Sequence, residues 1–121
     1  MTENKKIYDL EERTAKFGED AIRFCLKVPK GPVTNRLISQ LVGATTSTGA
    51  NYSEADDAES KQDFRHKIGI CKKESRESKH FLRMLIVAVP ELPELQDEAR
   101  RLWQEAKELN LIFNAIFRKL K

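Results

Sequence analysis

The residues best placed to do chemistry in this chain are basic side chains that recur along residues 61–89. A helix over that range would place them along one face, and no carboxylate interrupts the stripe. Lysine and arginine in such a row neutralise nucleic-acid phosphates and give salt-dependent, weakly sequence-selective affinity. We name this stripe the basic ridge. Its candidate RNA-binding residues are Arg65, Lys72, Lys73, Arg76, Lys79 and Arg83.

The alternative interpretation of the basic ridge is a helix face that contacts only solvent. Runs of charged residues more often form such a face than a binding site. No aromatic residue is interleaved in the ridge, so we expect contacts to the RNA backbone and shape rather than base stacking. The formal net charge of +3 and the pI near 8.9 are mildly basic. That balance is too weak by itself to indicate a nucleic-acid partner.

A second group of polar residues falls on the inward stripes of two adjacent helical segments. Buried amides and carboxylates destabilise the fold unless they are hydrogen-bonded, so these residues must satisfy one another, a neighbouring subunit or a ligand. We interpret the group as structural, fixing helix register and pairing, with ligand binding as the alternative. This polar belt comprises Thr45, Thr48, Asn51, Glu54, Glu74, Ser75 and Glu77.

Catalytic and metal-binding patterns are weak. Bundle di-metal sites need a Glu-x-x-His motif on two helices, and the motif occurs here once, from Glu77 to His80. The sequence has no nucleophile elbow and no glycine-rich phosphate loop. We therefore predict no enzymatic activity, no catalytic residues, no metal or other cofactor, and no small-molecule substrate. Cys25 and Cys71 fall on inward stripes, which favours buried free thiols over a disulfide.

Four amphipathic segments position these residues. We expect helices over residues 11–28, from a cap at Thr34 or Asn35 to about 57, over 61–89, and from Pro93 to the C-terminus. A proline-containing turn at 29–32 separates the first helix from the second, and another at 90–93 separates the third from the fourth. Ser60 followed by Asp63 resembles a capping box before the third helix.

Short connections force successive helices to run antiparallel. The sequence therefore predicts an all-α, antiparallel up-down-up-down four-helix bundle. Its 121 residues make one domain, 1–121, in which residues 1–8 form a flexible N-terminal segment. We see neither a signal-peptide run nor the ~20 apolar residues that span a bilayer, so we expect a cytoplasmic protein with no membrane partner.

Apolar residues outside the main stripes predict self-association. The apolar arcs of the third and fourth helices are wider than one bundle needs, and contiguous exposed apolar patches usually mark an interface. Scattered surface hydrophobic residues are the alternative. The candidate oligomer interface consists of Phe81, Met84, Trp103 and Leu111.

Two segments also resemble the signatures of a known family. Residues 45–55, TTSTGANYSEA, resemble a second-helix signature of the form T-S-I-G-A-N-Y-x-E-A, and residues 63–77, DFRHKIGICKKESRE, resemble a third-helix signature. The family is that of four-helix-bundle proteins encoded in intervening sequences of bacterial 23S ribosomal RNA genes. The resemblance covers nearly the whole chain.

This resemblance implies a homopentamer without catalytic activity, whose association with RNA or the ribosome is suggested by gene location and whose molecular role is unsettled. A distant and more basic branch of the fold is accessory to retroelement reverse transcriptases, which gives the alternative function of a protein-interaction scaffold. Two departures are Thr48, where the family usually has an apolar residue, and Gly43, where a basic residue is common. The second departure weakens nucleic-acid contacts by that helix.

Overall fold

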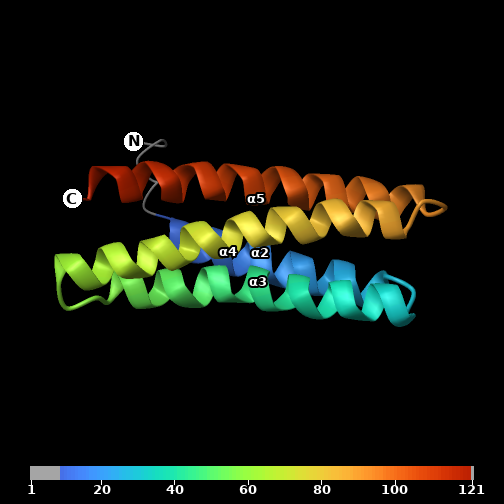
Figure 1. Ribbon diagram of the computed structural model, residues 1–121, viewed down its shortest axis with the longest axis horizontal. Helices are drawn as coiled ribbons and strands as arrows, with labels where there is room; N and C mark the ends of the chain where they lie inside the picture. Colours follow the sequence, from blue (N-terminus) through green and yellow to red (C-terminus); the bar gives the residue numbers. More distant parts are fainter. Residues whose placement is uncertain (1–8, 121) are drawn as a thin grey trace.

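The computed structural model of the chain describes residues 9–120, and over that range it is built of four long helices joined by short turns. These are α2 (Leu10–Lys27), α3 (Pro32–Asp56), α4 (Lys61–Ala88) and α5 (Pro93–Lys119). They lie side by side along one axis and alternate in direction (Figure 1). The predicted all-α four-helix bundle is confirmed. The expected flexible segment, residues 1–8, lies outside the described residues.

The helices pack in a closed cycle. Each lies against its neighbours in the sequence, and α2 also lies against α5 through the least extensive of the four contacts. The α3–α4 seam and the α2–α5 seam are therefore on opposite sides of the bundle. None of the described helices combines the length and apolar composition needed to cross a bilayer.

Two of the predicted helix starts are confirmed. Ser60 caps α4, because its hydroxyl oxygen accepts a hydrogen bond from the Asp63 amide at 3.0 Å. Pro93 opens α5, where its preset φ suits the first turn and its missing N–H costs nothing.

The predicted start of the second helix is wrong. α3 begins at Pro32, before the expected caps at Thr34 and Asn35, because a proline in the first turn starts a helix as readily as a polar cap. The Thr34 hydroxyl instead donates to the Pro29 carbonyl oxygen at 2.7 Å, which fixes the turn between α2 and α3.

Large apolar side chains fill the centre. Fully buried examples, one or more from each helix, are Phe17, Phe24, Leu41, Ile68, Leu82, Leu85, Leu109 and Phe113. Both thiols are free and buried as predicted, and burial raises the pKa of Cys25 to about 11 and that of Cys71 to about 12. At neutral pH they are protonated side chains of the core rather than nucleophiles.

Candidate nucleic-acid interface

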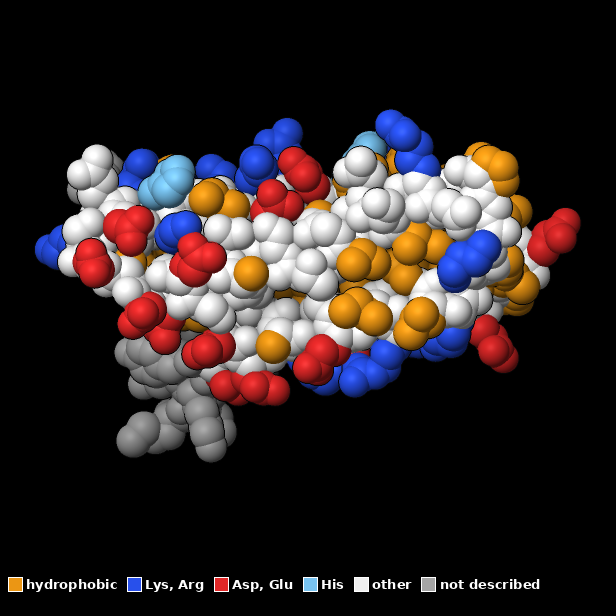
Figure 2. Space-filling model, turned by 90° about the horizontal axis from the view of Figure 1, so that it is seen from below, with side chains coloured by type: hydrophobic (Ala, Val, Ile, Leu, Met, Phe, Trp, Pro, Cys, Tyr) orange, Lys and Arg blue, Asp and Glu red, His pale blue; other side chains and the backbone are white. Residues whose placement is uncertain are grey.

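The basic ridge of α4 is divided by its neighbours into two flanks. Three cations spaced seven residues apart turn toward α5, and we call them the α5 flank: Arg65, Lys72 and Lys79. Two further cations turn toward α3 and line a groove together with His80, and we call these three the α3 flank: Lys73, Arg76 and His80. Arg83 lies one heptad beyond Arg76 and is exposed. The two histidines, both on α4, mark that helix along the upper edge of Figure 2, where Lys and Arg side chains also gather.

Cations of the α5 flank lie over aromatic rings of α5. The Arg65 guanidinium carbon is 3.9 Å from the centroid of the Phe117 ring, and the Lys72 Nζ atom is 4.7 Å from the same centroid. The Lys79 Nζ atom is 5.9 Å from the Trp103 ring. Each such contact contributes ~0.5–1 kcal/mol at exposed sites. This flank is thus engaged in holding α5 onto α4.

A glycine makes room for the ring in this contact. A Cβ atom on Gly69 would lie 3.1 Å from the Cε1 atom of Phe117, so a larger residue would displace the ring. Arg65 Nε also donates a hydrogen bond to the carbonyl oxygen of Leu120, the residue that follows the last turn of α5. Sequence reasoning missed this contact. The available signal was a small residue on the ridge between Arg65 and Lys72.

The α3 flank is concave and open. Its groove, of about 600 Å³, is lined by Gln40 of α3 and by Lys73, Arg76, Glu77, His80 and Phe81 of α4. Within residues 9–120, neither Arg76 nor Arg83 forms an ion pair, and Lys73 reaches Glu74 at 3.7 Å. Arg76 and Arg83 are thus neither paired with a described carboxylate nor held over a ring, whereas the cations of the α5 flank are held over aromatic rings of α5.

Hydroxyls of the polar belt are satisfied within their own helices. Thr45, Thr48 and Ser75 each donate to the backbone carbonyl oxygen three or four residues earlier, over 3.4, 2.9 and 3.1 Å. The Cys71 thiol lies 3.6 Å from the Thr48 carbonyl oxygen, so the two helices meet at the expected level. No buried side-chain nitrogen or oxygen of the described residues lacks a partner. These contacts favour the structural interpretation of the belt.

The outer members of the belt differ from expectation. The Asn51 amide donates to a carbonyl oxygen of its own helix at 2.9 Å. The inward placement of Glu54 is wrong: its side chain is 59% exposed, and it pairs with Lys67 at 2.5 Å across the α3–α4 seam. Ala55 takes the buried position next to it. Glu77 is also exposed, at the rim of the α3-flank groove.

Glu74 and a residue of α5 complete the belt. Burial, followed by repulsion from Glu77, raises the pKa of the Glu74 carboxyl above its ordinary value. Asn110 was missed by sequence reasoning, and its amide donates to the Lys72 carbonyl oxygen at 2.8 Å and to the Ser75 hydroxyl at 3.3 Å. In the part of the chain that the structure describes, no three His, Cys, Asp or Glu side chains gather as a metal-binding group.

The candidate oligomer interface is unevenly exposed. Leu111 is 57% exposed, whereas Phe81, Met84 and Trp103 are half-buried. Phe81 and Trp103 also pack against the core. Of these four residues, Leu111 is therefore the one freest to contact a partner.

Further exposed apolar surface lies near the turn between α2 and α3. Leu26 is 74% exposed, Val33 is 66% and Ile22 is 40%. Hydrophobic side chains gather on the right-hand half of the face that carries α3 (Figure 2). Sequence reasoning missed this patch because it considered the apolar excess of α4 and α5 alone.

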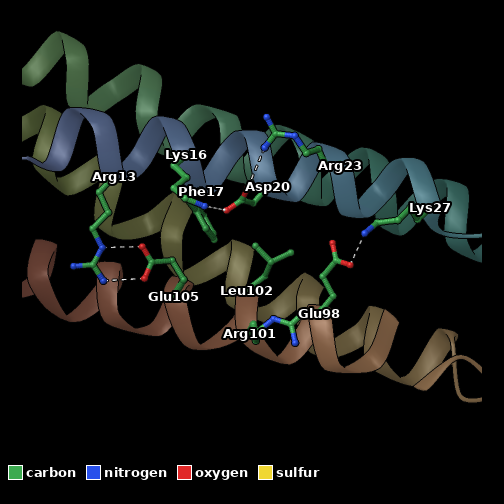
Figure 3. A pocket seen from close by; sticks show the side chains of 10 residues that line it. All are labelled: Arg13, Lys16, Phe17, Asp20, Arg23, Lys27, Glu98, Arg101, Leu102 and Glu105. Carbon is green, nitrogen blue, oxygen red and sulfur yellow. Dashed lines mark hydrogen bonds and ion pairs between the residues drawn. The ribbon is translucent and has the colours of Figure 1, made fainter. Parts of the chain in front are cut away.

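The loose α2–α5 seam forms a groove of about 680 Å³ on the side opposite the α3 flank (Figure 3). Ion pairs bridge its rims: Arg13 binds Glu105 in bidentate fashion at 2.7 and 2.8 Å, and Lys27 binds Glu98 at 2.6 Å. Arg101 is exposed on the same rim and makes no ion pair with the described residues. The bridges join α2 to α5 where their packing is least extensive.

Comparison with solved structures shows a similar fold in a protein of unknown function from the S23 ribosomal protein family of Bacteroides thetaiotaomicron. That protein is 24% identical, the match covers 88% of this chain and 96% of the other, and the TM-score is 0.74. No family model matches this chain, and no curated protein matches it. At this level of identity the likeness shows the shared fold.

Proposed function

We propose that this chain is a non-enzymatic, self-associating bundle that binds structured RNA through the α3 flank and Arg83. The observation that carries the proposal is the pair Arg76 and Arg83. Both are exposed, they lie one heptad apart on α4, and neither pairs with a carboxylate among residues 9–120. RNA as the ligand class is favoured by the family resemblance of the sequence alone.

The spacing of this pair suits backbone recognition. Seven residues of α-helix rise about 10 Å, so the two guanidinium groups reach different phosphates. Guanidinium binds phosphate oxygens with two parallel hydrogen bonds. Binding of this kind follows the shape of the RNA, weakens as salt rises, and discriminates little between base-paired sequences.

A mobility shift with fragments of structured ribosomal RNA tests the proposal. We expect a complex at low micromolar protein in low salt, with weaker binding at physiological ionic strength because phosphate contacts release counterions. Absence of a complex at low micromolar protein in low salt would contradict RNA binding.

Self-association is the second part of the proposal, supported by the exposure of Leu111 beside a bundle whose core is already filled. Soluble homo-oligomers are usually closed and symmetric. Five subunits are favoured by the family resemblance alone. A ring would also repeat the α3 flank around an axis and so raise the avidity of weak RNA contacts.

Leu111→Lys should convert the oligomer to a monomer of 14.0 kDa while keeping its helical circular dichroism. The lysine would place a charge in an apolar interface, whereas the inner side chains of Leu109 and Phe113 remain buried. Light scattering at micromolar concentration measures the mass. Val87→Lys is the matched control, since Val87 is 72% exposed at the far end of the bundle and should leave the oligomer intact. A wild-type monomer would refute self-association.

The alternative function is a protein-interaction scaffold, for example an accessory to a retroelement reverse transcriptase. The observation that favours it is the patch formed by Ile22, Leu26 and Val33, because exposed apolar surface suits a protein partner better than RNA. The genes beside this one discriminate between the two functions. A reverse transcriptase would favour the scaffold, and a ribosomal RNA operon would favour RNA binding.

A further inference from the structure

We propose that the groove of the α3 flank holds an unpaired nucleobase, which stacks on Phe81 while Lys73 and Arg76 contact the adjoining phosphates. The inference rests on the proposed RNA-binding function and names the kind of RNA that this surface selects. Loops, bulges and ends would bind better than continuous duplex, because the base must leave its stack to enter the groove.

The groove offers a ring that is already held in place. Phe81 is half-buried and packs against the core, yet it lines the open groove. The His80 ring lies 5.3 Å from it at an interplanar angle of 73°, an edge-on contact that supports one side. A fixed ring loses little conformational freedom when a base stacks on it. The sequence showed no aromatic residue among the cations of the ridge, and the structure places Phe81 beside them in this groove.

The walls of the groove match the rest of a nucleotide. Gln40 faces the cations from α3, and its side chain makes no hydrogen bond with other described residues. The amide group offers both hydrogen-bond donors and an acceptor. The edge of an unpaired base also carries donors and acceptors, so the two can form hydrogen bonds. Glu77 on the rim would repel a phosphate but accept a hydrogen bond from an exocyclic amino group. Lys73 and Arg76 supply the positive charge.

The other aromatic residue beside the ridge is not available for stacking. Phe117 already lies under the Arg65 guanidinium at 3.9 Å and beside the Lys72 ammonium at 4.7 Å, and it rests on Gly69. The ring is therefore already in contact with two cations of the protein itself. The groove of the α3 flank thus combines an aromatic ring, a side-chain amide without a hydrogen bond to the described residues, and two cations, of which Arg76 makes no ion pair with them.

The experiment compares two RNAs of equal length: a hairpin with an unpaired loop and a continuous duplex. Wild-type protein should bind the hairpin about tenfold more tightly, the effect expected of one stacked base. Phe81→Leu keeps an apolar side chain but removes the flat ring. This variant should bind the hairpin and the duplex about equally tightly, with its affinity for the duplex unchanged. Ile86→Leu is the matched control, since Ile86 is half-buried on the same helix, packs against the core and does not line the groove. It should keep the full preference.

Three outcomes would overturn the inference. Equal affinity of wild-type protein for the two RNAs, or equal loss of both in Phe81→Leu, would exclude the base site while leaving RNA binding by the ridge intact. Failure of both RNAs to bind would end the inference together with the proposed function. Thermal melting by circular dichroism identifies a variant that fails to fold. In that case Phe81→Trp replaces it, and because it keeps a flat ring, it must retain the hairpin preference.

Discussion

Replacing Arg76 and Arg83 together by glutamate should weaken binding of structured RNA about 100-fold at low salt. Each substitution removes an attraction to a phosphate and adds a repulsion of similar size. Two lost phosphate contacts should also reduce the slope of log affinity against log salt by about 1.8. Mobility shifts over a series of salt concentrations measure both quantities. The fold should persist, because exposed substitutions usually change the free energy of unfolding by no more than ~0.5 kcal/mol each.

The matched control carries the same charge change on the other side of the bundle. Arg23→Glu with Arg101→Glu also lowers the formal net charge by four, from +3 to −1. Both side chains are exposed and line the α2–α5 groove, diagonally across from the α3 flank. This pair should retain most of the affinity and the wild-type salt slope. Equal losses in the two double variants would mean that RNA responds to net charge rather than to the ridge.

The fold could be predicted because independent signals agree along the chain. Apolar residues recur at helical spacing in four segments, and turns containing proline, or a capping serine, fall between them. Ser60 and Pro93 therefore mark the starts of α4 and α5 correctly. The start of α3 was misplaced because a proline and a threonine lie within one turn, and both residues are good at starting helices.

The candidate site could be predicted only as one face of one helix. Periodicity places a side chain on a stripe about 100° wide, which is too coarse to decide whether a residue near the edge faces the core or a seam. Glu54 illustrates this limit: it was expected to face inward but pairs with Lys67 on the surface. The division of the basic ridge into two flanks also needed the neighbouring helices, since Phe117 and Gln40 come from α5 and α3.

Gly49→Val should lower the free energy of unfolding by about 2 kcal/mol, a large share of the 5–15 kcal/mol typical of a domain. A Cβ atom at Gly49 would lie 3.3 Å from the Thr14 carbonyl oxygen and 3.4 Å from its carbon. These are backbone atoms of α2, which cannot rotate away as a side chain would. The two γ carbons of valine would force α2 and α3 apart at this crossing. Denaturant unfolding at fixed protein concentration measures the change.

Gly43→Val in the same helix separates steric crowding from helix propensity. No atom of the surrounding structure lies within 4 Å of a Cβ atom at Gly43, which is exposed. Valine disfavours the helix less than glycine does, so this variant should be as stable as the wild type or more stable by ~0.5 kcal/mol. Replacing glycine by valine brings the same small gain in helix propensity at Gly49. The destabilisation from crowding against the Thr14 backbone must be larger than this gain for Gly49→Val to be less stable than the wild type. Equal unfolding free energies for the two variants would show that α2 and α3 can separate at their crossing without cost. Gly49 would then not be what sets the distance between them.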